Sequence, residues 1–150
     1  MKVVILIADD DEGVRTMLGR FLESENFNVV FARNGMQALF EFLIMPYDLA
    51  LLDLKMPGPG GWEVFESLSK LHPRMPIIIM TGQPNQQAHA ECAGVDGLLE
   101  KPIDPWLLLE TIRGALARRE PVRTTRLALP CRDTTARPQA GAAVPLTLEV

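Results

Sequence analysis

The chain has 150 residues, of which 47% are hydrophobic and 23% are charged, a composition typical of one globular domain with or without a tail. Residues 1–120 carry 11 Lys and Arg residues against 17 Asp and Glu residues, and such an acidic body argues against direct nucleic-acid binding. No apolar run approaches the ~20 residues of a membrane helix and the N-terminal apolar run is too short for a signal peptide, so we expect a cytoplasmic protein without a membrane segment.

The first half of the chain alternates between continuous apolar segments and amphipathic segments. The apolar segments are rich in Val, Ile and Leu, which is typical of strands that are buried on both faces of a parallel sheet. The amphipathic segments repeat apolar residues at helical spacing, as Val14, Leu18 and Leu22 do. In chain order we predict a strand at Val3–Ala8, a helix at Glu12–Ser24, a strand at Phe27–Ala32, a helix capped by Asn34 that runs to about Ile44, and a strand at Leu49–Asp53.

The second half continues this alternation after a loop at residues 58–61, which contains three Gly residues and one Pro. In chain order we predict a helix at Trp62–Leu71, a strand at Ile77–Thr81, a short helix that Pro84 can begin and Gly94 ends, a strand at Leu98–Leu99, and a last helix up to about Arg118. The last helix has Asp104 as its N-cap and Pro105 at its first position. Five strands that alternate with five helices predict an α/β fold with a doubly wound, five-stranded parallel sheet.

The last helix carries large apolar residues outside its expected buried stripe. That stripe consists of Leu108, Leu109, Ile112 and Leu116. A rotation of ~100° per residue places Trp106 and Leu107 well off the stripe, which indicates an exposed patch and a partner surface. The alternative is that Trp106 packs against its own neighbours or against the tail.

The periodic pattern ends after Arg119. Residues 121–150 are rich in Pro, Arg, Thr and Ala and carry four Arg residues against two acidic residues, so the charge changes sign near residue 120. About thirty residues are too few for a second folded domain without disulfides or a metal. We therefore predict a folded domain at residues 1–119 and a disordered tail at residues 120–150.

Chemically active side chains stand at the carboxyl ends of four predicted strands. Asp9 and Asp10 follow the first strand, Asp53 ends the third, Thr81 ends the fourth and Lys101 follows the fifth. Ligands of open α/β sheets bind beyond these ends, so we expect the side chains to share one crevice. Taken one at a time, these residues have ordinary explanations: an acid pair at a helix N-terminus, a Thr in a turn and a solvated Lys before a loop. Together, at these strand ends, they indicate a functional site.

The acidic residues predict a metal site within this crevice. Asp9, Asp10 and Asp53 would repel one another there, which raises the pKa of one or more carboxyls unless a cation neutralises the charge. Oxygen ligands, without a His or Cys at any strand end, favour Mg²⁺ over softer metals.

Asp53 lies at the end of a buried strand, where an unpaired charge is costly. An ionised Asp can act as a nucleophile toward phosphorus and form an aspartyl phosphate. Lys101 supplies positive charge and Thr81 supplies a hydroxyl donor for the phosphate oxygens, while Gly82 leaves room for the phosphoryl group. The set therefore predicts phosphoryl transfer to Asp53 by positioning and charge neutralisation.

Four motifs carry a resemblance to a known family. They are Ile-Leu-Ile-Ala-Asp-Asp-Asp at residues 5–11, Leu-Leu-Asp-Leu-Lys-Met-Pro-Gly at 51–58, Met-Thr-Gly at 80–82 and Glu-Lys-Pro at 100–102. In this order they resemble the receiver domain of two-component response regulators, over residues 2 to about 119. The resemblance implies a flavodoxin-like receiver fold and a role in phosphorelay signal transduction.

The resemblance also implies how the protein acts and with what. Asp53 would accept a phosphoryl group from a sensor histidine kinase or a phosphotransfer protein, and Thr81 and Lys101 would bind the phosphoryl oxygens. Self-catalysed phosphotransfer and autodephosphorylation are expected, without further enzymatic activity. The last strand and the last helix would form the surface that binds a second copy of the chain or an effector protein in response to phosphorylation.

For the metal, the resemblance implies a ligand set around Asp53. Asp10 would bind Mg²⁺ directly, Asp9 would bind it through water, and the backbone carbonyl of Lys55 would be a further ligand. Because three aspartates follow one another, Asp11 is the alternative should the register differ by one residue.

Two features depart from the family pattern. Thr81 and Lys101 are 20 positions apart, about two fewer than is usual, and the shortening falls in the loop or helix after Thr81. Leu98 stands where the family usually has an aromatic residue that acts as a rotamer switch. We expect the phosphorylation chemistry to survive both changes, but not the usual switch mechanism.

Three other hypotheses remain open. A haloacid-type aspartyl-phosphate phosphatase has a nucleophilic Asp in a similar fold, but it needs an acid two residues later, where Lys55 stands. A purely structural receiver would not need the complete set of acids, Thr81 and Lys101. The chain is also compatible with a receiver fragment of a longer regulator that has an output domain.

Overall fold

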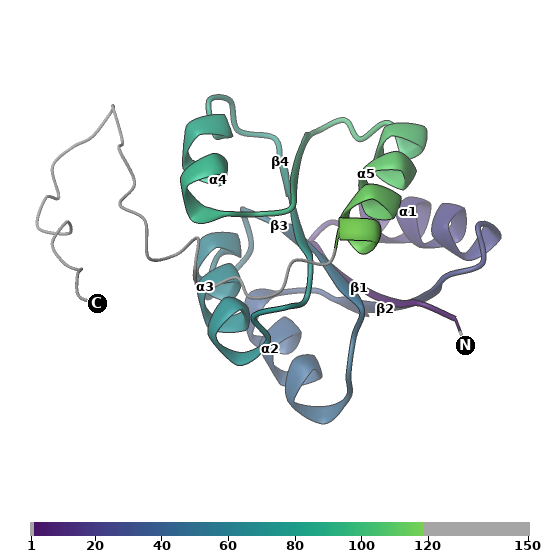
Figure 1. Ribbon diagram of the computed structural model, residues 1–150, viewed down its shortest axis with the longest axis horizontal. Coiled ribbons are helices and arrows are strands. Elements are labelled where there is room, and N and C mark those ends of the chain that lie inside the picture. The colour runs from purple at the N-terminus through teal and green to yellow at the C-terminus, as the bar shows by residue number, and fades with distance from the viewer. Residues whose placement is uncertain (1, 119–150) are drawn as a thin grey trace, which may run out of the picture.

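Five parallel strands form a single sheet in the order β2-β1-β3-β4-β5 (Figure 1). The structure is a computed structural model that describes residues 2–118. The strands are β1 (Val4–Ala8), β2 (Asn28–Ala32), β3 (Leu49–Asp53), β4 (Ile77–Thr81) and β5 (Gly97–Glu100). The strand order reverses between β1 and β3, so the carboxyl ends of these two strands border the crevice where doubly wound folds bind their ligands.

Five helices cover the two faces of this sheet. They are α1 (Glu12–Ser24), α2 (Gly35–Ile44), α3 (Gly61–Leu71), α4 (Gln87–Ala93) and α5 (Pro105–Arg118). α1 and α5 lie on one face, and α2, α3 and α4 lie on the other (Figure 1). The prediction of a doubly wound α/β fold with five strands and five helices is confirmed.

Each face of the sheet has its own hydrophobic core, because successive residues of a strand point to opposite faces. Ile5, Ile7 and Leu51 pack with α1 and α5, whereas Leu6 and Leu52 pack with α2 and α3. All five side chains are fully buried. Burial on both faces requires apolar residues at every strand position, which is why these strands lack the alternation of a half-exposed strand.

Two helices begin at the caps that the sequence predicts. Asn34 Oδ1 accepts a hydrogen bond from the backbone N–H of Gln37 at 2.8 Å, and Asp104 Oδ1 accepts one from that of Trp106 at 3.0 Å. Asp11 caps α1 in the same way, an assignment that the sequence analysis did not make. These bonds satisfy backbone donors that have no partner within their helix.

The segment between β4 and α4 differs from its prediction. α4 begins at Gln87, so Pro84 lies in the preceding loop and does not start the helix. The backbone N–H of Gln83 is held by the Thr81 side chain, and the first helical bond of this segment runs from Ala90 N to Gln86 O. The helix ends at Gly94 as predicted, with a φ of 83° that favours glycine.

α5 largely has the two faces that the sequence predicts. Leu108, Leu109 and Ile112 are buried, but Leu116 is only partly buried, and Ala115 completes the stripe. The predicted exposed pair is confirmed, since Trp106 is 64% exposed and Leu107 is 49% exposed. The Trp106 ring also meets the ring of Phe21 in α1 edge-on, at 5.1 Å between centroids, so one side of it is packed.

Within residues 2–118, no helix is both long enough and apolar enough to cross a membrane. The tail predicted at residues 120–150 and its boundary near residue 119 lie outside the described residues.

Candidate functional site

The sheet register brings together the strand ends that the sequence marks. β1 and β3 are paired in register, so Asp9, which follows β1, lies beside Asp53 at the end of β3. β4 lies on the other side of β3, and its last residue, Thr81, pairs with Glu100, which precedes Lys101. The predicted crevice is therefore a consequence of strand order and register.

Three carboxylates form a cluster at this edge. One oxygen each of Asp9, Asp10 and Asp53 lies within 4.8 Å of the others. Asp9 is fully buried and Asp53 is 3% exposed, whereas Asp10 is exposed, so the cluster is open to solvent on one side. Oxygen donors with access to water are what Mg²⁺ prefers, since it usually keeps several water ligands in proteins. The donor set fits this cation.

Lys101 bridges the two buried carboxylates. Its Nζ lies 2.8 Å from Asp9 Oδ2 and 3.3 Å from Asp53 Oδ1. The second oxygen of Asp9 accepts a hydrogen bond from the backbone N–H of Asp11 at 2.9 Å. These contacts compensate two negative charges that burial would otherwise make costly.

Asp53 is the carboxyl whose ionisation the site opposes most clearly. Burial raises the pKa of Asp53 from 3.8 to about 6, and the charge of Asp9 adds to this effect. Lys101 and a backbone hydrogen bond from Lys55 act in the opposite direction. For Lys101, burial acts to lower the pKa, but its hydrogen bond to Asp9 and the charges of Asp53 and Asp9 outweigh burial and raise it. A further cation beside Asp53 would favour its ionised form.

Thr81 is fully buried and already has a hydrogen-bond partner. Its Oγ1 accepts a bond from the backbone N–H of Gln83 at 2.8 Å and lies 3.4 Å from the Gln83 carbonyl oxygen, to which its hydroxyl donates. A Cβ added to Gly82 would meet no atom within 4 Å, so there is open space beside this hydroxyl.

Asp10 and Asp53 of the carboxylate cluster, the Thr81 side chain and the Lys101 side chain line one cavity of about 600 Å³. Its lining residues are Asp10, Asp11, Asp53, Lys55, Met56, Pro57, Thr81, Gly82, Gln83 and Lys101. Of the predicted site residues only Asp9 is not part of the lining, because it lies beneath Lys101 and is fully buried. Asp11 lines the cavity but uses its side chain to cap α1.

Gly61 positions the site and was missed by the sequence analysis, which treated residues 58–61 only as a loop. A Cβ on Gly61 would lie 2.5 Å from the carbonyl oxygen of Asp53 and 2.7 Å from Leu54 Cα. The start of α3 therefore approaches the end of β3 more closely than any side chain would allow. The available signal was three glycines within the four residues at 58–61.

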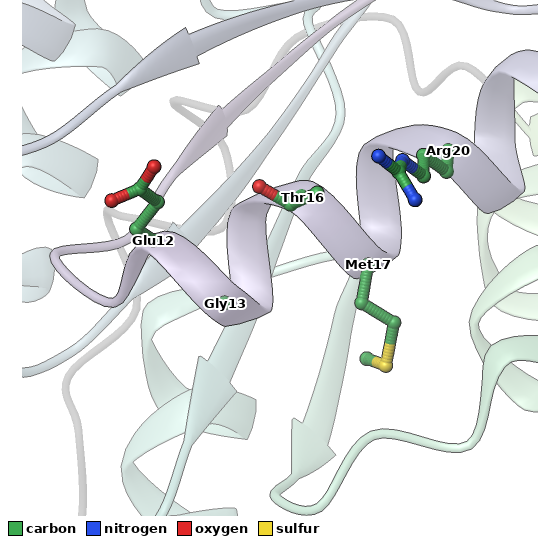
Figure 2. A pocket seen from close by; sticks show the side chains of 5 residues that line it. All are labelled: Glu12, Gly13, Thr16, Met17 and Arg20. Carbon is green, nitrogen blue, oxygen red and sulfur yellow. The ribbon is translucent and has the colours of Figure 1, made fainter.

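A second hollow, of about 670 Å³, lies on the exposed side of α1. It is lined by Glu12, Gly13, Thr16, Met17 and Arg20, all of them exposed. Figure 2 shows Glu12, Thr16 and Arg20 on the same side of the helix, with Met17 pointing away from them. No motif in the sequence pointed to this surface.

Comparison with protein families gives one match to most of the chain. A family model described as the response regulator receiver domain matches residues 5–113. Among solved structures, a CheY-like response regulator receiver domain protein from Methanospirillum hungatei is 32% identical, with a TM-score of 0.75 over 79% of this chain and 97% of that one. The response regulator TrrA of Thermotoga maritima, solved in complex with Mg²⁺-BeF, is 30% identical, with a TM-score of 0.71 over 77% of this chain and 99% of that one.

Curated relatives are longer than the matched region. The transcriptional regulatory protein GlrR of Escherichia coli is 35% identical over 124 residues, which are 81% of this chain and 28% of that protein. The response regulator RR06 of Streptococcus pneumoniae is 34% identical over 116 residues, which are 76% of this chain and 53% of that protein. The chain thus spans between about a quarter and a half of the length of these relatives.

Proposed function

The chain belongs to the response regulator receiver domain family of two-component systems, and from this membership we propose that it carries a phosphoryl group on Asp53. The observation that carries the assignment is the position of Asp53. It is buried at the end of β3, ion-paired with Lys101 and open to a cavity that it shares with Asp10 and Thr81. No other carboxylate among the described residues combines these features.

We assign phosphoryl transfer to direct attack by Asp53. A carboxylate oxygen of Asp53 forms a bond to phosphorus while the bond from phosphorus to the donor nitrogen of a phosphohistidine breaks. The electron pair of that bond leaves with the imidazole, which then takes up a proton. Small acyl phosphates serve the same reaction with an oxygen leaving group, so transfer does not require a kinase active site.

Mg²⁺ is the cofactor that the donor set fits. Asp10, Asp53 and the backbone carbonyl of Lys55 would hold it directly and Asp9 would hold it through water. When bound, it neutralises charge on the phosphoryl oxygens and on the carboxylates. The likeness to TrrA, which was solved in complex with Mg²⁺-BeF, supports this assignment.

Lys101 and Thr81 stabilise the phosphoryl group in this proposal. Lys101 already contacts Asp53 and turns its ammonium group toward a phosphoryl oxygen once the charge on Asp53 moves onto that group. The Thr81 hydroxyl leaves the Gln83 carbonyl, which it reaches only at 3.4 Å, for a charged acceptor. Water attack on phosphorus in the same site gives autodephosphorylation, and we propose no further enzymatic activity for this domain.

We propose two surfaces for protein partners. A sensor histidine kinase or phosphotransfer protein approaches the mouth of the cavity and contacts the exposed hollow of α1, which begins at Glu12, directly after the cavity residue Asp11. A second copy of the chain or an effector protein binds β5 and α5, and α5 exposes Trp106 and Leu107.

The haloacid-type phosphatase hypothesis has no support in the chain. Lys55 stands where that class needs its second acid, and both the family match and the similar structures favour a receiver.

The test of the proposed function is acyl phosphorylation of the full chain. With Mg²⁺ and acetyl phosphate, intact mass spectrometry should detect one added phosphoryl group on the wild-type protein and none on Asp53→Asn. Asp104→Asn is the matched control, since it changes a carboxylate that does not line the cavity, and Asn retains the N-cap of α5, so labelling should be unchanged. Equal labelling of the wild type and Asp53→Asn would overturn the assignment.

A further inference from the structure

Trp62 of α3 makes packing contacts that have no role in the proposed function. Its indole ring stacks on the imidazole of His89 in α4, with 4.1 Å between ring centroids and 13° between ring planes. The Trp62 ring also lies at nearly a right angle to the ring of Phe65, which is buried in the core, with 6.0 Å between centroids and 89° between ring planes. Trp62 is therefore fixed to α3 on one side and presents its face to α4 on the other.

Trp62 also holds the residue that begins α4. Its indole N–H donates to Gln86 Oε1 at 3.4 Å, and the amide nitrogen of Gln86 donates to the Pro84 carbonyl at 3.4 Å. Gln86 is the N-cap residue of α4, but its side chain makes no capping bond to that helix. The Gln86 side chain thus ties the loop at residues 82–86 to α3.

The other end of this loop is tied to the site. Thr81 accepts the hydrogen bond from Gln83 N at 2.8 Å, and the space beside Gly82 is open. The loop is consequently held at two points, by a site residue at its start and by Trp62 at its end. α4 itself adds little, because it has seven residues and Ala90 is its one buried side chain.

We infer that Trp62 is a positioning residue that, through Gln86 and His89, holds the loop at residues 82–86 in the arrangement that precedes phosphorylation. The inference rests on the proposed function of Asp53. Thr81 has one hydroxyl proton, so donating it to a phosphoryl oxygen ends its bond to the Gln83 carbonyl. The loop then moves into the open space beside Gly82, and the stack of Trp62 on His89 opens.

Loosening the Trp62 contacts should therefore favour the phosphorylated arrangement. A ligand that prefers one of two arrangements binds more tightly when the other is destabilised. Beryllofluoride with Mg²⁺ is the probe, as an analogue of the aspartyl phosphate. We expect Gln86→Ala and Trp62→Phe to bind it about fivefold more tightly than the wild-type chain, the effect of one lost hydrogen bond. Tyr47→Phe is the control, because it removes a hydrogen bond to Glu41 away from the loop.

The movement itself can be followed by fluorescence. The sequence has two tryptophans, so Trp106→Phe leaves Trp62 as the single reporter and keeps a ring against Phe21. Beryllofluoride should change the Trp62 emission in this background, and Asp53→Asn should abolish the change. His89→Ala should raise the emission before addition and reduce the change, because the stacked imidazole is then absent.

The outcomes separate the inference from the proposed function. Calorimetry that detects tighter beryllofluoride binding in Gln86→Ala, together with the fluorescence change, supports the role of Trp62. A different result overturns the inference but leaves Asp53 as phosphoacceptor. In that case the wild-type chain binds beryllofluoride, Gln86→Ala and Trp62→Phe bind it with the same affinity, and the Trp62 emission stays constant. Absence of binding and of acetyl phosphate labelling in the wild-type chain overturns both. A purely structural Trp62 would lower the melting temperature of Trp62→Phe without tightening beryllofluoride binding.

Discussion

At Asp53, burial and the neighbouring charge of Asp9 oppose ionisation, whereas Lys101 favours it. The ion pair only partly offsets burial, so the pKa of Asp53 remains raised, at about 6. At neutral pH the carboxylate is ionised and available as a nucleophile, but at a cost to folding. In the proposed function, a bound cation and the transfer of charge onto a phosphoryl group would both relieve this unfavourable charge on Asp53.

The raised pKa has a consequence for stability. Between about pH 4 and pH 6 the folded protein holds the Asp53 proton, which the unfolded chain has lost, so this residue's contribution to stability falls as pH rises through that window. In Mg²⁺-free buffer, Asp53→Asn should be more stable than the wild type at pH 7.5, by on the order of 2 kcal/mol. Urea unfolding at pH 4 and pH 7.5 checks this: the advantage of the variant should shrink at pH 4. An advantage that is the same at both values would contradict the argument.

Asp10 is the exposed member of the carboxylate cluster, and we expect it to contribute most to metal affinity. Asp10→Asn should weaken Mg²⁺ binding by about tenfold, because ligand charge governs the affinity of such sites. Asp11→Asn is the matched control, since it changes the next residue and Asn can still cap α1. Thermal melts with and without Mg²⁺ provide the readout. The assignment of Asp10 fails if Mg²⁺ raises the melting temperature of both variants equally.

Among the secondary-structure elements, α3 is placed by a glycine rather than by a side-chain contact. Gly61 begins the helix, and its missing side chain lets the helix start against the Asp53 carbonyl and Leu54. Close approach at this point fixes the loop that carries Lys55 and so shapes one wall of the cavity.

Gly61→Ala should therefore disturb both folding and chemistry. The added Cβ would lie 2.5 Å from a backbone oxygen, which cannot move without shifting the end of β3. We expect a loss of about 1–3 kcal/mol of stability in urea unfolding, and slower labelling of Asp53 by acetyl phosphate. Gly114→Ala in α5 is the control, because its added Cβ would meet only the end of the Arg118 side chain, at 3.5 Å. Unchanged stability and labelling in Gly61→Ala would show that the contact is not required.

α5 combines the two alternatives that the sequence left open for Trp106. The side chain is 64% exposed, as a partner surface requires, and it also packs edge-on against Phe21. Such an aromatic pair stabilises a protein by about 0.5–1.5 kcal/mol beyond its buried area. Its loss should be tolerated by a chain whose α5 buries four other apolar residues.

Trp106→Ala should accordingly lower the melting temperature only slightly and leave labelling of Asp53 intact. If α5 is a partner surface, the variant should weaken self-association of the beryllofluoride-bound chain in analytical ultracentrifugation, or weaken its binding to an effector. Thr111→Ala, on the same helix, is the control for general damage to α5. A fall of many degrees in melting temperature with unaltered association would identify Trp106 as a core residue instead.

Across the whole molecule, the two helix layers and the strand order act together to create the site. The central strands β1, β3 and β4 are covered on both faces, so their apolar residues are buried and their polar residues are confined to the ends. Parallel pairing then places all carboxyl ends at one edge, which gathers residues that are up to 92 positions apart, from Asp9 to Lys101. The chemistry of the site thus depends on the topology as much as on any one residue.

Sequence patterns alone were enough to predict the order of the strands and helices, the caps at Asn34 and Asp104, and which side chains stand at the strand ends. These features are local: apolar periodicity, cap residues and motifs occupy short segments, and the physical preference of each segment is expressed within it. The motifs around Asp53, Thr81 and Lys101 also identified the family, as the family match over residues 5–113 confirms.

Other features could be seen only in the folded chain: the ion pair of Lys101 with Asp9, the raised pKa of Asp53, the close approach at Gly61 and the stack of Trp62 on His89. The start of α4 at Gln87, three residues after the Pro84 that the sequence offered as its beginning, was likewise not predicted. Each of the first four features depends on burial or on a partner elsewhere in the chain. Distances between such groups follow from strand order, register and helix packing, which no short segment encodes, because they arise only when the two cores form on either side of the sheet.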